Sequence, residues 1–305
     1  MANHEANVLR FGIQRKIVAT MTTESWRHVP HVSFVYEPDV TKFVEEYKKF
    51  DEETPYRLTF NTAMLKAIAE GIKANPAMNA HIHYELKLVR GKLKYFDNVD
   101  ISVPWTLPDG NMMTICMKDV GNKSLEEMAA YTDDINRRLK NTNLTEALYS
   151  VSIHDTMKRL TSGHVLSALQ RLYGSKTNPR HRVSPLKGRA KKEYDSIPDA
   201  DKITYDDLKQ GTVTVSNIGA ASKGINGYLD MLMIIPPQIC AIGLSALQKK
   251  PVVIKDENGE ERVEVRTILP ICICFDHRAL DFGEIQPFIA RMEEIFEKPD
   301  IVLKK

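Results

Sequence analysis

The sequence lacks the features that would assign it to several common classes of protein. Its four cysteines form no C-x-x-C pair, so the spacing typical of zinc or redox motifs is missing. No apolar run is long enough to cross a bilayer, and the first residues lack the apolar core of a signal peptide. Basic and acidic residues nearly balance, 42 against 40, so composition favours neither nucleic acid nor an anionic membrane as partner. We therefore expect a soluble, cytoplasmic protein without a metal site.

The sequence does contain enough apolar material for a sizeable core. Its 305 residues are 43% hydrophobic, which allows one large domain or two ordinary ones. Cys272 and Cys274 stand two apart in an apolar run, so on a strand they share one face. A bridge between such neighbours would need poor geometry, and we expect all four cysteines to be reduced thiols.

Sequence periodicity predicts a chain that mixes helices and strands. Strands are predicted over 31–37, 99–105, 112–117, 212–217, 238–247 and the apolar run 264–275, with hairpins over 82–95 and 252–265. Helices are predicted over 8–26, 41–50, 59–74, 124–139, 141–172 and 285–296. The part from about 146 to 195 differs in character. We interpret it as an inserted helical and basic excursion, because strands resume after it.

The sharpest local feature is F-D-H-R-A-L-D at 275–281, between an apolar strand and the final helix. A histidine at a strand end is held rigidly yet can face a cleft, as a general base requires, and imidazole titrates near neutrality. Asp276, Arg278 and Asp281 flank His277 and form a charged cluster that can fix the loop by charge-assisted hydrogen bonds. Taken alone, the pattern equally fits a solvated strand end without a special role.

Five segments, in order along the chain, resemble the catalytic domain of 2-oxoacid dehydrogenase acyltransferases, which is related to chloramphenicol acetyltransferase. At 269–281 a strand and a D-H-R-x-x-D loop resemble the family's H-x-x-x-D-G signature. The other four resemble S-x-x-x-x-P-H-V at 25–32, the T-P-D-G strand pair at 103–119, G-T-x-T-x-S-N-x-G within 203–219 and N-P-P-x-x-A-I-L-G at 235–243. Five ordered matches are far more specific than any one of them.

The resemblance implies a fold and an activity. The implied fold is α/β: a chloramphenicol-acetyltransferase-like mixed, largely antiparallel sheet flanked by helices. It forms a single catalytic domain over 1–305, with the excursion at about 146–195 inserted. The implied activity is transfer of an acyl group between a thioester of coenzyme A, or of dihydrolipoamide, and a small acceptor. Coenzyme A or acyl-CoA then acts as a substrate, and no metal or covalent enzyme intermediate is implied.

The resemblance also assigns roles to individual residues. In this family a histidine deprotonates the attacking thiol or hydroxyl, which makes His277 the general base. A serine of the S-N-x-G segment, here Ser216, stabilises the oxyanion. Asp281 takes the structural or polarising position of the signature. Arg278 and Asp276 belong to the ion-pair network of the same loop.

The family builds trimers with each active site between two subunits. We therefore expect a homotrimer in which His277 and Ser216 come from different chains, with components of a 2-oxoacid dehydrogenase complex as further partners. The last residues resemble the family's cage-forming tail, but the terminal Lys304 and Lys305 favour an isolated trimer. We expect no lipoyl or peripheral-subunit-binding domain, and so no covalently bound lipoyl group, on this chain.

Three residues depart from the family pattern. Phe282 stands where the family has glycine, so the loop geometry or part of the channel is expected to change. Pro104 and Trp105 replace small aliphatic residues, which puts the usual substrate in doubt. Two alternatives to a free-standing enzyme therefore stay open: a core or accessory subunit of a complex whose lipoyl domain lies on another chain, and a degenerate, non-catalytic trimeric scaffold.

Two further patterns are interpreted as having no binding or catalytic role. The basic stretch 171–192 could bind the phosphates of coenzyme A or nucleic acid, but we prefer a solvated run of charge and expect no nucleic-acid partner. His81 and His83 share a strand face if 82–95 is a hairpin, yet no third ligand for a metal is evident. We interpret these two and the neighbouring His28 and His31 as surface or structural histidines.

Overall fold

The chain folds into two compact units, which are described separately. The computed structural model describes residues 10–107, 112–161, 165–176, 185–219, 227–256 and 258–304. One unit, here the small unit, comprises residues 1–24 and 135–208, and the other, here the sheet unit, comprises 25–134 and 209–305. Two of the three divisions fall within α1 (Ile13–His28) and α4 (Leu125–Lys140), and the third follows residue 208.

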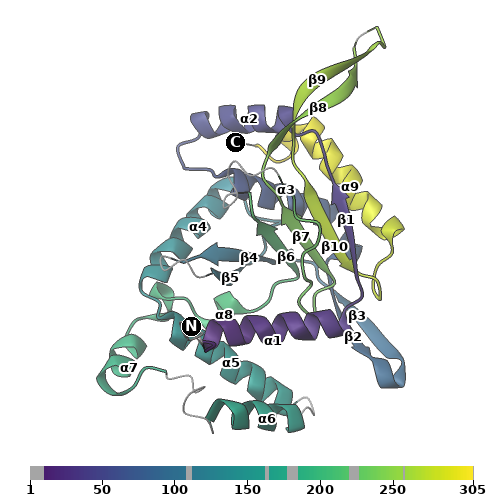
Figure 1. The fold of residues 1–305 in the computed structure, drawn as a ribbon. Helices are drawn as coiled ribbons and strands as arrows, with labels where there is room; N and C mark the ends of the chain where they lie inside the picture. The colour runs from purple at the N-terminus through teal and green to yellow at the C-terminus, as the bar shows by residue number, and fades with distance from the viewer. Residues whose placement is uncertain are drawn as a thin grey trace, which may run out of the picture. The chain divides into compact units, whose positions relative to one another are not determined.

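The sheet unit is built on a mixed sheet, drawn in Figure 1. In the described residues it has six strands in the order β1-β10-β7-β6-β4-β5. β6 pairs in parallel with β4 and β7, and the remaining neighbours are antiparallel, which confirms the predicted mixed, largely antiparallel sheet. The strands are β1 (His31–Tyr36), β4 (Ile101–Thr106), β5 (Met112–Met117), β6 (Val213–Asn217), β7 (Cys240–Leu244) and β10 (Ile271–Asp276).

Four helices contribute to the core of the sheet unit in the described residues: α2 (Thr41–Glu53), α3 (Phe60–Ala74), the first part of α4, and α9 (Phe282–Glu297). The helix predicted over 59–74 is confirmed as α3, and its apolar side chains at helical spacing are buried, since Met64, Leu65, Ile68 and Ile72 are at most 2% exposed. α3 packs against α9, and a side chain at Gly71 would come within 2.7 Å of the Phe288 ring. Glycine therefore sets how closely these two helices approach.

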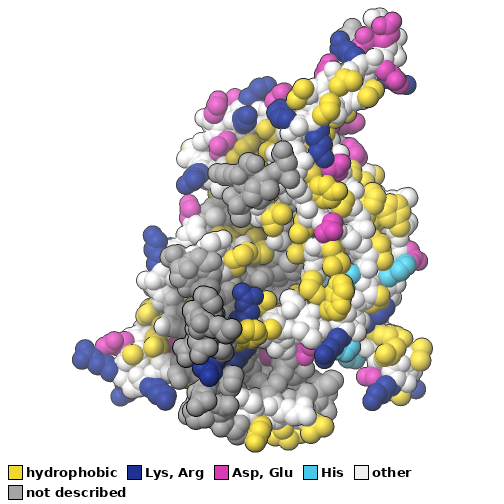
Figure 2. Space-filling model, viewed as in Figure 1, with side chains coloured by type: hydrophobic (Ala, Val, Ile, Leu, Met, Phe, Trp, Pro, Cys, Tyr) yellow, Lys and Arg dark blue, Asp and Glu magenta, His cyan; other side chains and the backbone are white. Residues whose placement is uncertain are grey.

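Two hairpins complete the sheet unit. β2 (Ala80–Glu85) pairs with β3 (Arg90–Tyr95), and β8 (Gln248–Lys255) pairs with β9 (Glu261–Ile268). The second extends away from the sheet in Figure 1 and carries exposed hydrophobic side chains, visible in Figure 2. The prediction of one strand over 264–275 is wrong, because Pro270 has no N–H for a ladder and separates β9 from β10.

The small unit is helical in its described residues. It contains α5 (Leu144–Thr161), α6 (Val165–Lys176), α7 (Gly188–Asp195) and the single turn α8 (Tyr205–Leu208). α5 packs against both α6 and α8. The predicted helix over 141–172 is in fact two helices, and residues 162–164 between them lie outside the described part. The excursion predicted at about 146–195 falls within this unit.

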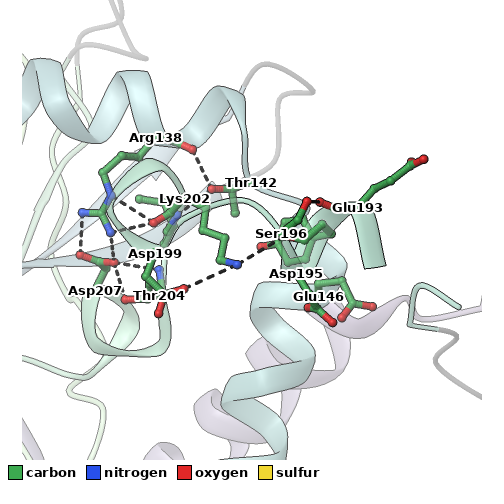
Figure 3. Close-up of polar contacts among 12 residues, drawn as sticks. Arg138, Thr142, Glu146, Glu193, Asp195, Ser196, Asp199, Lys202, Thr204 and Asp207 are labelled. Atoms are coloured by element: carbon green, nitrogen blue, oxygen red, sulfur yellow. Dashed lines mark hydrogen bonds and ion pairs between the residues drawn. The ribbon is translucent and has the colours of Figure 1, made fainter. Parts of the chain in front are cut away.

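One buried ion pair ties the end of α4 to α8 in the small unit, as Figure 3 shows. The Arg138 guanidinium donates to both carboxylate oxygens of Asp207, at 3.0 and 2.5 Å, and their side chains are 11% and 12% exposed. The Thr204 amide and hydroxyl also donate to this carboxylate, each at 2.8 Å. Burial raises the pKa of Asp207, but the donors outweigh it and hold that pKa below its ordinary 3.8.

Arg138→Met should destabilise the protein strongly, because it leaves a buried carboxylate without its cation. We expect a loss of about 3–5 kcal/mol in the free energy of unfolding, measured by urea denaturation at neutral pH. The adjacent Arg137 pairs with Asp201 at an exposed site, so Arg137→Met is the matched control and should cost no more than about 1 kcal/mol.

The same pair predicts the direction of a pH effect. Because the folded state lowers the pKa of Asp207, the stabilisation is present above 3.8 and is lost as pH falls through the folded-state pKa. The difference between wild type and Arg138→Met should therefore shrink in acid. An equal difference at neutral and strongly acidic pH would contradict this role for the pair.

Candidate active site

His277 follows β10 directly, and its imidazole is held in one orientation. Its backbone N–H donates to the Pro30 carbonyl at 3.0 Å. Nδ1 lies 3.2 Å from the Leu280 carbonyl and 3.1 Å from Asp281 Oδ1. Both neighbours are acceptors, so in the neutral ring the proton sits on Nδ1 and Nε2 is the basic nitrogen. The side chain is 54% exposed, which leaves it accessible to a substrate or to another subunit.

The loop that carries His277 is fixed by an ion pair beneath it. Asp276, the last residue of β10, is fully buried, and its carboxylate accepts from Arg278 Nε at 3.0 Å and from a terminal guanidinium nitrogen at 2.6 Å. The Arg278 backbone N–H also donates to this carboxylate, at 3.0 Å. The guanidinium lies 5.8 Å from the centre of the Tyr84 ring, on the β2–β3 hairpin. Asp276 and Arg278 therefore hold the loop rather than face a substrate.

Asp281 joins the histidine loop to the final helix. Its carboxylate contacts His277, and its backbone N–H donates to Glu284 at 2.7 Å, one half of a capping box. Phe282, which stands in the place of the family glycine, is the first residue of α9, and helical backbone suits any side chain there. Its ring packs edge-on against Phe34 at 5.0 Å. Phe282 thus extends an aromatic contact on the sheet unit without straining the loop.

Ser216 lies near the opposite end of the sheet from His277. It is level with Gly243 of β7, and Gly243 is level with Cys272 of β10. His277 follows Cys272 by five residues, which places it about 17 Å from the level of Ser216 along the strand direction. Across the sheet, two strand spacings of about 4.8 Å separate β10 from β6. Ser216 and His277 of one chain do not meet. Among the described residues the Ser216 hydroxyl has no hydrogen-bond partner.

The residues after Ser216 form a compact turn. Asn217 Oδ1 accepts from the Gly219 N–H at 2.8 Å, and Asn217 Nδ2 donates to Asn61 Oδ1 at 3.0 Å. A side chain at Gly219 would come within 2.7 Å of the Ser245 carbonyl, so the turn requires glycine. The S-N-x-G segment is thus a tight turn that also connects β6 to the first turn of α3.

A cavity of about 280 Å³ opens beside this turn. Asn61 lines it together with Thr59 and Thr62, the residues around the start of α3, and with Pro104 and Trp105 at the end of β4. Both bulky departures from the family pattern therefore face the same cavity. The sequence did not identify the α3 residues as part of a site. In the sequence, these residues were recognisable only as the start of a predicted helix. In the structure, the Thr59 side chain accepts a hydrogen bond from the Thr62 N–H.

His31 and two of the cysteines have structural surroundings. His31 Nδ1 contacts the Val29 carbonyl at 2.8 Å and Nε2 accepts from the Ile234 N–H at 3.1 Å, while burial lowers its pKa, so the neutral ring pins residues near 234 to β1. Cys272 and Cys274 share one face as predicted, with their sulfurs 3.4 Å apart. In the described residues no group of three or more His, Cys, Asp or Glu could hold a metal ion. No described helix is both long and apolar enough to traverse a bilayer.

The chain also matches a known protein family over most of its length. The family model for the 2-oxoacid dehydrogenases acyltransferase (catalytic domain) matches residues 3–150 and 190–303, which is most of the chain. The chain belongs to this family. The match covers the histidine loop, the Ser216 turn and the cavity, and it leaves out residues 151–189. The Mycobacterium relative that the chain matches is named an acetyltransferase, which is a transferase.

Among relatives of the family, the acetyltransferase component of the pyruvate dehydrogenase complex of Mycobacterium bovis is 23% identical over 288 residues. The match covers 93% of this chain and 40% of that protein, so the chain spans less than half of its relative.

Two solved structures of family members share the fold. The cubic core of the pyruvate dehydrogenase multienzyme complex has a TM-score of 0.65 and 19% identity, with 99% of this chain and 95% of that chain covered. A structure of Azotobacter vinelandii dihydrolipoamide acetyltransferase gives the same four values. It was solved to investigate a serine, a histidine and an asparagine in the catalytic mechanism of that enzyme.

Proposed function

We propose that the chain transfers an acyl group between a thioester of coenzyme A, or of dihydrolipoamide, and a small acceptor. The observation that carries the proposal is the fixed imidazole of His277, whose Nδ1 is held by Leu280 and Asp281 while Nε2 is left as a base. The histidine and the asparagine investigated in the Azotobacter enzyme stand four positions apart in its sequence, as His277 and Asp281 do here. The four-residue spacing of His277 and Asp281 and the orientation of the imidazole thus both support His277 as the general base.

The proposed reaction needs one proton acceptor and one oxyanion donor. Nε2 of His277 takes the proton from the acceptor's thiol or hydroxyl, whose sulfur or oxygen attacks the thioester carbonyl carbon. The resulting tetrahedral oxyanion accepts a hydrogen bond from the Ser216 hydroxyl. The intermediate then collapses, the bond to the leaving sulfur breaks, and that sulfur takes the proton back from His277. Asp276, Arg278 and Asp281 hold the imidazole in place.

The site is proposed to lie between two copies of the chain. Ser216 and His277 of one chain lie at opposite ends of the sheet, whereas the reaction requires both groups at one carbonyl. A second copy that brings its Ser216 to the exposed His277 satisfies this requirement. A closed ring of such head-to-tail contacts gives every copy one complete site, and we propose the homotrimer as that ring.

The cavity lined by Asn61, which contacts the turn after Ser216, supports a small substrate. Its volume of about 280 Å³ is at or below the lower limit of typical ligand pockets, which hold roughly 300–1,000 Å³. Trp105 and Pro104 supply bulk, and threonine hydroxyls and Asn61 supply polar contacts. Because the Mycobacterium relative is named a dihydrolipoyllysine-residue acetyltransferase, acetyl-CoA with dihydrolipoamide is the first pair to test. A lipoyl group borne by another chain would make this chain the core subunit of a complex.

The direct test is turnover by the purified chain. Acetyl-CoA and dihydrolipoamide are incubated with the protein, and chromatography follows free coenzyme A and S-acetyl-dihydrolipoamide. The proposal predicts that both products appear in equal amounts. If acetyl-CoA and longer acyl-CoA thioesters all remain intact with thiol, hydroxyl and amine acceptors, the chain is instead a non-catalytic scaffold.

A further inference from the structure

Residues 227–235, which we call the strap, cover part of the sheet unit without forming a strand. Three hydrophobic side chains of the strap pack against a small buried cluster that includes Cys272 and Cys274 of β10. In the described residues, the strap's one backbone–backbone hydrogen bond lies at its end, from the Gln238 N–H to the Ile235 carbonyl. The strap is therefore held on the sheet by side chains, and its attachment depends on their chemistry.

Side chains of the sheet unit bind the backbone of the strap at several points along its length. Their hydrogen bonds include Leu229 N–H to Ser245 Oγ at 3.0 Å, Leu232 N–H to Cys274 Sγ at 3.0 Å, Ile234 N–H to His31 Nε2 at 3.1 Å, and the Ser33 and Ser25 hydroxyls to the carbonyls of Asp230 and Ile234. His31 differs from the serines because imidazole titrates near neutrality. A change of pH can therefore act on this contact.

Ile234 is held at both of its backbone groups. Its N–H donates to His31 Nε2 at 3.1 Å, and its carbonyl accepts from the Ser25 hydroxyl at 2.5 Å. His31 Nδ1 lies 2.8 Å from the Val29 carbonyl, which can only accept, so Nδ1 carries the proton and Nε2 does not. Ile234 is fully buried, so its N–H has no water to bind if His31 ceases to accept.

Protonation of His31 would give Nε2 a different partner. In the imidazolium Nε2 is a donor, so it can no longer accept from the Ile234 N–H. Ser25 Oγ lies 3.3 Å from Nε2, and because its own hydrogen points to the Ile234 carbonyl, its oxygen is the acceptor for an Nε2–H. The charged ring thus binds Ser25 and leaves a buried backbone N–H without an acceptor, which destabilises the closed strap.

The surroundings of His31 keep its ring neutral while the strap is closed. Burial lowers the pKa of His31 below its ordinary 6.5, and the Val29 carbonyl and the Asp276 carboxylate oppose this shift. The Arg278 guanidinium, which pairs with Asp276, lowers the same pKa further. Because closure lowers the pKa, the stabilisation by His31 is fully present above pH 6.5 and weakens as the pH falls below that value.

We propose that the strap is a pH-sensitive cover, held closed by neutral His31 and released when that ring is protonated, so that the thiols of Cys272 and Cys274 become exposed. The two cysteines are fully buried, with their sulfurs 3.4 Å apart. His31 follows Pro30, whose carbonyl accepts from the His277 N–H, so the contact lies beside the histidine loop. The proposal does not depend on turnover, so it can fail or succeed independently of the proposed enzymatic function.

Cys274 is a second contact of the strap whose charge changes with pH. A hydrogen bond from Cys272 outweighs burial and lowers the pKa of Cys274 to about 7. Protonation of this sulfur would weaken its contact with the Leu232 N–H, which acts in the same direction as protonation of His31. A substitution at position 31 leaves the two cysteines unchanged, so it separates the two contributions.

The test is labelling of the intact protein with 4,4′-dithiodipyridine at about pH 5.5 and about pH 7.5, with the loss of each free thiol followed by peptide mass spectrometry. Cys116 and Cys240 are internal controls, because they are buried but do not belong to the cluster beneath the strap. Labelling of Cys272 and Cys274 relative to His31→Gln should rise by up to about tenfold for each pH unit below 6.5.

His31→Gln is the central variant, because the glutamine carbonyl oxygen can replace Nε2 and accept from the Ile234 N–H at either pH. It should keep both thiols protected in mild acid. His31→Phe offers no acceptor and should expose them at neutral pH as well. His83→Gln, at an exposed histidine of β2, is the matched control and should behave like the wild type.

Hydrogen exchange of the strap provides a second measurement that needs no variant and no thiol reagent. In the wild type, the protection of residues 228–235, corrected for the intrinsic exchange rate at each pH, should fall in mild acid while that of β7 stays unchanged. Equal corrected protection of the strap at both pH values would overturn the proposal.

Two labelling results would also overturn the proposal. If acid exposes Cys272 and Cys274 equally in the wild type and in His31→Gln, the pH sensitivity belongs to Cys274 rather than to His31. If acid exposes Cys116 and Cys240 together with the other two, the whole sheet unit unfolds and the strap does not open by itself.

Discussion

His277→Ala should lower acyl transfer by about 10²–10⁴-fold, because it removes the group that we propose takes the proton from the attacking thiol. Most of the loss should appear in kcat, since the imidazole acts on the reacting atoms and contributes little to binding the rest of the substrate. The rate is measured with acetyl-CoA and dihydrolipoamide at saturating concentrations. The side chain is half exposed, so its truncation should leave the fold intact.

His83→Ala is the matched control for this substitution. His83 is an exposed histidine on β2, outside the candidate site, and its loss should change the rate less than about twofold. If His277→Ala instead retains the full rate while His83→Ala is also unchanged, His277 is not the general base. The enzymatic interpretation of the histidine loop would then be withdrawn.

Ser216→Ala should lower kcat by about 10²–10³-fold, because it removes the hydroxyl that we propose donates to the oxyanion. The KM for acetyl-CoA should change little, since the oxyanion exists only after the attack. Steady-state kinetics separate the two constants. The serine hydroxyl makes no hydrogen bond within the described residues, so this substitution removes no polar side-chain contact there.

Thr214→Val provides the control for the serine. Thr214 lies two residues before Ser216, on the same face of β6, and its hydroxyl donates to Gln238 at 2.6 Å. Its loss should reduce stability modestly while kcat stays within about twofold of the wild type. A fall in kcat of the same size in both variants would indicate general damage to β6 rather than loss of an oxyanion donor.

Local patterns predicted much of the fold because their physical causes are local. Ser124 and Glu127 have the spacing of a capping box, which predicts the start of the helix over 124–139, and both of its hydrogen bonds form, at 2.8 and 3.1 Å. Alternation of side chains predicted β1 and β6, and apolar residues at helical spacing predicted α3. The division at Pro270 was missed because 264–275 reads as one apolar run, although the proline itself marks the break.

The candidate site was predicted only in part, because its pieces are joined by tertiary contacts. The charged cluster around His277 is local, so its ion pair followed from spacing. The contact between Asn217 and Asn61 joins residues 156 apart, and no local pattern encodes it. The exposed face of α6 also needed coordinates, since Leu172 of this helix is half buried while Leu166 and Leu169 are exposed.

Complementation between two inactive variants tests the central claim most directly. Chains carrying His277→Ala and chains carrying Ser216→Ala are given different affinity tags, co-expressed, and purified through both tags so that every oligomer contains both. In a mixed trimer one of the three interfaces joins an intact His277 to an intact Ser216, so the account predicts about one third of the wild-type rate. Mixed oligomers no more active than either parent would contradict a site shared between neighbouring chains.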